Sequence, residues 1–165
     1  MTPLIVRLPN HLGDACMSIA ALDALAQAGH ALTLAGRPWI RSLFEAYPWP
    51  TVALTGSRGD RIRALSAAAA AAGARGLLFT NSFSTALEFR LAGIAATGYA
   101  RGGRSLLLSQ AVAVNDADHM VEYYHRLATT LIAQPTAVPA ALDLRVSDAA
   151  RQRMHTALTD ACLSR

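Results

Sequence analysis

Lysine is absent from this sequence of 165 residues, and all 15 of its basic residues are arginine. Codon bias accounts for part of this composition, since alanine also runs unbroken over residues 67–72. Arginine presents a planar fork of N–H groups that fits carboxylates and phosphates, and it stays charged at working pH. The net charge of +4 is consistent with an anionic partner and equally with a mildly basic, solvated surface.

Cysteine and long apolar runs are scarce as well. Cys16 and Cys162 form no metal or redox motif, which favours a reducing compartment. No apolar run approaches the ~20 residues of a membrane span, and the N-terminus lacks the charged and then apolar pattern of a secretory signal. Because 53% of the residues are hydrophobic, we expect a well-packed globular protein in the cytoplasm.

Motifs of several common chemistries are missing. There is no G-x-G-x-x-G after the first predicted strand and no P-loop, so ordinary dinucleotide or nucleoside triphosphate binding is not indicated. No G-x-S-x-G segment marks a serine hydrolase. The histidines are scattered, with His119 and His125 six residues apart, so we expect no metal site. The arginines are not interleaved with aromatic residues, and we expect no nucleic-acid partner.

Strand-like and helix-like segments alternate along the chain. Strands are predicted at residues 4–8, 31–35, 51–54, 77–80 and 95–99, with a further β-like piece at 106–108. Helices are predicted at residues 14–28, 38–47, 60–72, 81–91, 119–133 and 147–165. Such alternation predicts an α/β fold: a Rossmann-like, doubly wound, mostly parallel sheet flanked by helices. We expect this domain to occupy residues 1–141, and residues 142–165 to form a C-terminal helix and linker.

Single residues place several helix ends. Pro38 suits the first turn of its helix, and Gly73 stands where a helix would end in a left-handed conformation. Asp60 is the predicted N-cap of its helix, and Ser147-Asp148 is the predicted cap of the last helix.

The opening of the chain carries the most informative pattern. A loop with Pro9, Asn10 and Gly13 follows the first predicted strand and leads to Asp14 at the start of a helix. In a parallel α/β sheet, ligands collect at the loop that follows the first strand. Free backbone N–H groups and the helix dipole also stabilise a carboxylate at a helix N-terminus. Spacing alone therefore favours a capping role for Asp14, with ligand chemistry as the alternative.

Three ordered segments resemble a known family. They read LIVRLPNHLGDACMSIAALDAL at residues 4–25, LLFTNSFSTALEFRLAGIAATGYARGGRSLLLSQAV at 77–112 and HMVEYYHRL at 119–127. They are similar to the bacterial ADP-heptose:lipopolysaccharide heptosyltransferases of glycosyltransferase family 9. Their order and spacing agree best with the second heptosyltransferase of inner-core assembly, and the resemblance covers nearly the whole chain.

The resemblance implies one half of a two-domain GT-B glycosyltransferase. In that family the N-terminal domain binds the lipopolysaccharide acceptor, and the C-terminal domain binds the ADP-heptose donor. This chain corresponds to the N-terminal half, so it needs no cofactor of its own. Its implied partners are the absent donor domain and an inner-core acceptor of the heptosyl-Kdo-lipid A type. We expect peripheral contact with the cytoplasmic face of the inner membrane, and no transfer by this half alone.

The resemblance also assigns residues. Asp14 matches the family's Gly-Asp loop, whose carboxylate is the catalytic base of an inverting transfer. The implied substrate-binding residues are Asn10, Gly13, Asn81, Ser82, Phe83, Ser84, Arg101 and Arg104. For Asn10 the alternative is a turn-forming role, and for Ser82 it is a helix cap. For each arginine the alternative is a solvated surface position.

Two positions depart from the family pattern. Thr80 stands where proline commonly precedes the Asn-Ser-Phe motif, and His11 replaces a tryptophan or similar bulky residue in the first loop. Both leave the acceptor specificity open. An alternative function is therefore a non-catalytic α/β module, derived from the same family, that binds an anionic glycolipid or a protein. A nucleotide-binding domain is disfavoured because a phosphate loop is missing.

Overall fold

A single parallel sheet forms the centre of the molecule. The computed structural model describes residues 2–134, 137–139 and 141–163. Within these residues six strands pair in the order β3-β2-β1-β4-β5-β6, and every pairing is parallel. The strands are β1 (Thr2–Arg7), β2 (His30–Gly36), β3 (Thr51–Ala53), β4 (Arg75–Leu78), β5 (Ala96–Tyr99) and β6 (Gln110–Val112). The predicted doubly wound α/β fold is confirmed, and the sheet is parallel throughout.

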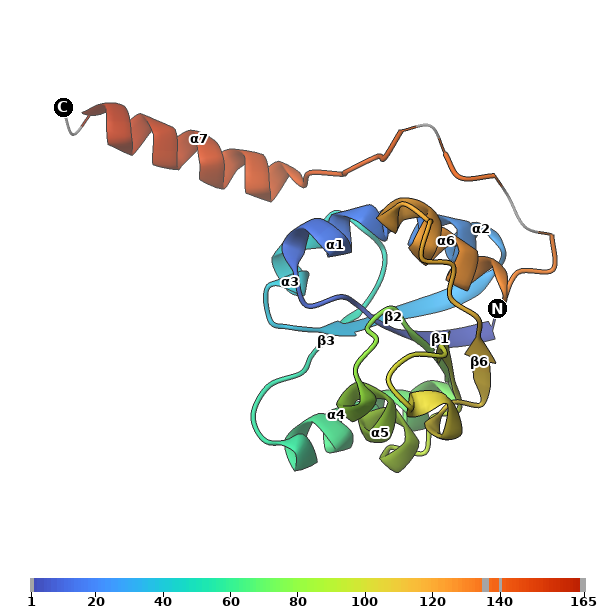
Figure 1. Cartoon of the computed structure of the whole chain (residues 1–165). Coiled ribbons are helices and arrows are strands. Elements are labelled where there is room, and N and C mark those ends of the chain that lie inside the picture. Colours follow the sequence, from blue (N-terminus) through green and yellow to red (C-terminus); the bar gives the residue numbers. More distant parts are fainter. Residues whose placement is uncertain (1, 135–136, 140, 164–165) are drawn as a thin grey trace.

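Helices cover both faces of this sheet (Figure 1). The elements on one face are α1 (Leu12–Met17), α2 (Ile19–Gln27), α3 (Ile40–Leu43) and α6 (Met120–Thr129). Those on the other face are α4 (Arg58–Ala72), α5 (Phe83–Leu91) and the 3-10 helix η1 (Arg104–Leu107). Each face has its own hydrophobic core, so both sides of the central strands are buried.

Side chains of β1 alternate between these two cores. Leu4 and Val6 face the layer of α2 and α6, whereas Ile5 faces the layer of α4 and α5. Arg7 shares the side of Ile5, because successive residues of a strand point to opposite faces. A charged side chain therefore enters the α4–α5 layer at the carboxyl end of the central strand.

The start of α4 forms a capping box. The Asp60 amide donates to Ser57 Oγ at 3.3 Å, and the Ser57 amide donates to Asp60 Oδ2 at 2.9 Å. Ser57 is thus the N-cap, and the prediction that Asp60 caps this helix was wrong by three positions. Gly73 ends the helix as predicted, with a φ of 61°.

Other boundaries also differ from the predictions. The predicted helix over 14–28 divides into α1 and α2 at Ser18, whose buried hydroxyl donates to the Ala15 carbonyl at 2.7 Å. The helix predicted from Pro38 is confined to α3. The β-like piece predicted at 106–108 was wrong: η1 covers most of it, and β6 follows.

The C-terminal helix α7 (Asp148–Leu163) projects away from the sheet (Figure 1). Its residues 148–161 are largely exposed. Ser147 caps it as predicted, since its Oγ accepts the Ala150 amide at 2.9 Å. The expected division at residue 141 stays a prediction. Within the described residues, no helix has both the length and the apolarity that a membrane crossing requires.

Candidate functional site

The candidate site lies where the strand order reverses. β1 pairs with β2 on one side and with β4 on the other, so the chain winds outward from this point in both directions. In open α/β sheets, ligands bind beyond the carboxyl ends of the strands at such a switch point. The loops that leave β1 and β4 there, together with the first turns of the helices that follow them, contain Asn10, Gly13, Asp14 and residues 81–84.

Asp14 lies in the first turn of α1, and it does not cap that helix. His11 is the N-cap residue and makes no side-chain capping bond. Within the described part of the chain, the Asp14 carboxylate forms no hydrogen bond or ion pair. Burial, and then the nearby Asp14 charge, raise the pKa of Tyr124 in α6. The half-buried Asp14 carboxylate therefore acts on Tyr124 and has no hydrogen-bonding partner in the described protein, and the capping role favoured by spacing was wrong.

Gly13 is not required by the fold. A Cβ added at this residue would meet no protein atom within 4 Å, and its φ is not positive. Neither packing nor backbone strain therefore demands a glycine beside Asp14. Its proposed role, close approach of a ligand to the backbone, stays a prediction.

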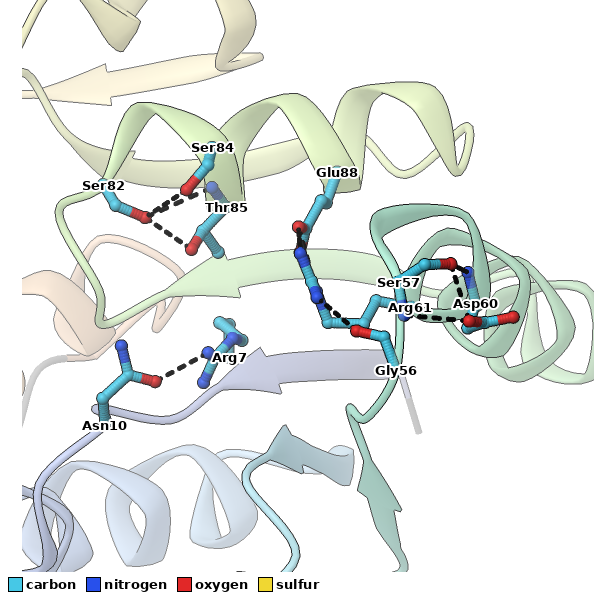
Figure 2. A network of polar contacts seen from close by, with 10 residues as sticks. All are labelled: Arg7, Asn10, Gly56, Ser57, Asp60, Arg61, Ser82, Ser84, Thr85 and Glu88. Atoms are coloured by element: carbon cyan, nitrogen blue, oxygen red, sulfur yellow. Dashed lines mark hydrogen bonds and ion pairs between the residues drawn. The ribbon is translucent and has the colours of Figure 1, made fainter.

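Arg7 is the functional candidate that sequence reasoning missed. Its side chain is 8% exposed; Nη1 donates to the Leu8 carbonyl at 2.5 Å, and Nη2 donates to Asn10 Oδ1 at 2.8 Å (Figure 2). Burial lowers the pKa of Arg7 to about 10. The available signal was an arginine inside an otherwise apolar strand, where charges are rare unless they are paired. Asn10 therefore positions Arg7 and keeps its own amide exposed.

The start of α5 is organised by Ser82. Its Oγ accepts the Thr85 amide at 3.2 Å and lies 2.6 Å from Thr85 Oγ1, with Ser84 Oγ at 3.3 Å (Figure 2). The helix-cap alternative for Ser82 is confirmed. Phe83 is 50% exposed next to it. Ser84 and Phe83 present polar and aromatic surface to solvent, and their sugar contacts stay predictions.

Arg104 is fully buried and bonded to the protein itself. Its Nε donates to the Tyr99 carbonyl at 2.9 Å, Nη1 to the Thr80 carbonyl, and Nη2 to Asn81 Oδ1 at 3.2 Å. Burial lowers the pKa of this guanidinium. The Asn81 amide in turn donates to the Tyr123 hydroxyl at 2.7 Å. Arg104 thus holds the loop after β4, and its charge does not reach the surface.

Arg101 is exposed and pairs with Asp116. It borders a pocket of about 170 Å³. The lining residues are Asn81, Arg101, Asn115, Asp116, Asp118, Met120 and Tyr123. Sequence reasoning identified Asn81 and Arg101 but missed Asp116 and Asp118, the acidic residues that line the same pocket. Both lie in a loop, residues 115–118, that contains no recognisable motif. The structure thus joins two predicted residues in one polar hollow.

The arginines near the start of α4 serve different contacts. Arg61 donates to Glu88 Oε1 from Nη2 at 2.6 Å and from Nε at 3.1 Å, and to the Gly56 carbonyl at 2.9 Å (Figure 2). The Glu88 hydrogen bond raises the pKa of Arg61. Arg63 is exposed and pairs with Asp60. Among the residues described, no group of three or more His, Cys, Asp or Glu could hold a metal ion.

Solved structures share this fold, although no family model and no curated protein matches the sequence. E. coli ADP-heptose LPS heptosyltransferase II aligns with 96% of this chain and 50% of its own, at 24% identity and a TM-score of 0.75. E. coli heptosyltransferase WaaC with ADP aligns with 94% of this chain and 53% of its own, at 16% identity and a TM-score of 0.68.

A glycosyl transferase family 9 protein from Veillonella parvula DSM 2008 aligns with 97% of this chain and 50% of its own, at 15% identity and a TM-score of 0.75. The chain therefore spans about half the length of the structures it matches. It has the fold of one Rossmann-like half of a GT-B glycosyltransferase.

Proposed function

We propose that this chain is the acceptor-binding half of a glycosyltransferase that transfers heptose from ADP-heptose to the lipopolysaccharide inner core with inversion. The observation that carries the proposal is the unpaired Asp14 carboxylate at the switch point of a sheet shared with heptosyltransferases. A carboxylate with no partner in the described protein is available to a substrate hydroxyl. This half alone carries out no transfer, because the donor is held by a second domain.

The proposed reaction is a direct displacement. The acceptor hydroxyl loses its proton to Asp14 as its oxygen attacks the anomeric carbon of the donor heptose. The bond from that carbon to ADP breaks, and the configuration inverts because attack and departure occur on opposite faces. General-base assistance of this kind contributes about 10²–10⁴-fold to the rate.

The remaining predicted residues have binding or positioning roles in this proposal. Ser84, Phe83 and the exposed Asn10 amide provide hydrogen-bonding and stacking groups for acceptor sugars near Asp14. Arg101 adds a positive charge at the polar pocket beside Asn81. Arg104 acts indirectly, because its bonds to Thr80 and Asn81 fix the loop after β4. The acceptor reaches the site from the cytoplasmic face of the inner membrane.

Titration of the chain with deacylated inner-core oligosaccharide, followed by NMR of backbone amides, tests the proposal. We expect shifts at residues 10–14, 81–84 and 101–104. ADP-heptose serves as the matched control ligand, and we expect it to leave those amides unchanged. Binding of ADP-heptose alone would assign the chain to the donor side. Absence of binding by either ligand would favour the non-catalytic alternative.

A further inference from the structure

The guanidinium of Arg7 is buried at the switch point without a carboxylate of its own. Its Nε is buried and has no hydrogen-bond partner among the described residues. The two bonds that it does make go to the neutral Leu8 carbonyl and to Asn10 Oδ1. Arginine offers five N–H donors, and burying a charge without a counterion is costly. A buried cation left in this condition indicates an anionic group that the protein itself does not supply.

Charges around Arg7 reinforce this imbalance. Glu88, Arg37 and Arg61 are the groups whose fields act on it. Glu88 is the carboxylate among them, and Arg61 already binds it through two N–H groups (Figure 2). Arg37 is exposed and forms no ion pair within the described residues. Three cations thus share one carboxylate, which leaves two positive charges uncompensated at this edge of the sheet.

A glycine at the end of β2 lets the Arg7 guanidinium approach the backbone near Arg37. Arg7 pairs in register with Ala35 of β2, and Gly36 follows at the carboxyl end of that strand. A Cβ placed on Gly36 would lie 3.6 Å from Arg7 Nη1 and 3.1 Å from Ile40 Cγ2. The glycine therefore lets the guanidinium lie over the end of β2, next to the point where Arg37 leaves the strand.

We propose that Arg7, Arg37 and the Asn10 amide form an oxyanion-binding subsite for the phosphate or carboxylate group of an acidic sugar. Arg7 provides the fixed, buried charge, and Arg37 closes over the anion from the surface. Asn10 holds Arg7 through Oδ1 and offers its amide N–H groups to the same ligand. The subsite deepens the proposed function, because an acceptor anchored here would extend from the loop that carries Asp14.

Binding of three matched ligands to the chain tests the subsite: glucose 6-phosphate, glucuronate and glucose, titrated at low salt and followed by NMR. We expect at least one acidic sugar to shift the amides of residues 7–10 and 36–38, and glucose to leave them unchanged. Response to the phosphate alone assigns a phosphate site, and response to glucuronate alone assigns a carboxylate site. Equal response to glucose, or no response to either acid, would overturn the proposal.

Variants separate this subsite from general charge attraction. Arg7→Lys keeps the charge but loses the planar fork, and we expect binding to weaken about tenfold or more. Arg37→Gln is a surface change that does not threaten folding, and it should weaken binding as well. Arg90→Gln removes one exposed charge at the far end of α5 and should change affinity less than about twofold. Unchanged binding in Arg37→Gln and Arg7→Lys would refute the subsite.

The titration with simple sugar acids tests the subsite independently of the titration with inner-core oligosaccharide. The simple sugar acids contain neither heptose nor an inner-core sugar, so their binding reports on the cation cluster alone. If they bind while the inner-core oligosaccharide does not, the subsite stands and the proposed function fails. If the oligosaccharide binds without shifting residues 7–10 and 36–38, the proposed function stands and the subsite fails.

Discussion

Arg7 and Arg104 are both buried, yet their guanidinium groups meet different surroundings. Arg104 donates to two carbonyls and one amide oxygen, so each of its nitrogens has a protein acceptor. Arg7 makes two such bonds, and its Nε has no partner among the described residues. One arginine therefore stabilises a loop, and the other keeps binding capacity for a ligand.

Asp14→Asn separates catalysis from binding. In the enzyme completed by its donor-binding half, we expect the transfer rate to fall about 10²–10⁴-fold, because the amide cannot accept the acceptor proton. Acceptor affinity, measured on the same variant, should change little. Asp148→Asn, which removes an exposed carboxylate from α7, is the matched control and should keep full activity. A rate within twofold of wild type in Asp14→Asn would rule out this residue as the base.

Arg104→Met tests the buried arginine as a structural residue. The change removes the Arg104 donor from the Tyr99 and Thr80 carbonyls and from Asn81 Oδ1. We expect a loss of about 2–4 kcal/mol in the free energy of unfolding. Arg101→Gln breaks an exposed ion pair and should cost less than about 1 kcal/mol. Urea denaturation of both variants measures the difference. Equal stabilities would contradict the structural role of Arg104.

The sequence was informative for residues whose role is local. Ser147 and Gly73 follow from cap preferences, and the structure has them where they were predicted. The roles of Arg7 and Arg104 depend on acceptors and charges brought together by the sheet: Arg104 bonds to Thr80, 24 positions away. No sequence window contains both partners, so motif reasoning placed Arg104 in a binding site and overlooked Arg7.

At the scale of elements, the same distinction explains the helix and strand errors. α1 and α2 meet at Ser18, whose buried hydroxyl donates to the Ala15 carbonyl. η1 replaces the predicted strand because its first residue, Arg104, is buried and bonds to the loop after β4. The alternation of strand-like and helix-like segments predicted the sheet, whereas tertiary bonds set these boundaries.

Packing of α6 against α2 predicts a pH dependence of stability. His125 lies buried in α6, its Nε2 has no partner among the described residues, and burial lowers its pKa from the usual 6.5. At a pH below 6.5 the His125 imidazole binds a proton in the unfolded chain but not in the folded protein. The folded state therefore loses stability as the pH falls through about 6.5 towards the folded-state pKa of His125. The full stability is present at a pH above about 6.5.

His125→Gln should flatten that dependence. We expect the difference in unfolding free energy between about pH 7 and about pH 5 to be smaller in this variant than in wild type. His155→Gln, on the exposed α7, should leave the wild-type difference unchanged. Urea unfolding at both pH values gives the comparison. An identical dependence in His125→Gln and wild type would show that another group is responsible.

At the scale of the whole molecule, residues 143–147 return along the body before α7 begins. The Tyr47 hydroxyl donates to the Asp143 carbonyl at 2.9 Å and accepts the Arg145 amide at 3.0 Å. The Arg145 guanidinium lies 5.0 Å from the centroid of the Tyr47 ring and 3.6 Å from Asp23. Tyr47 itself is stacked on Trp49 in the core, so the returning segment is held to a rigid support.

Tyr47→Phe should release this segment without disturbing the core. The ring and its stacking remain, but both hydroxyl bonds are lost, which we expect to cost about 1–2 kcal/mol of docking. Trypsin cleavage after Arg145 should accelerate about fivefold or more. Cleavage after Arg151 in α7 serves as the internal control and should keep its rate. Unchanged cleavage at both sites would show that the hydroxyl does not hold the segment.

The outermost strands of the sheet, β3 and β6, are three residues long each. A long, flat outer strand exposes a row of unpaired backbone groups that can template fibrils or strand exchange. Here β1 and β2 are the long strands, with 6 and 7 residues, and the strand at each edge of the sheet is short. The edges of the described sheet consequently offer few unpaired backbone groups for strand addition.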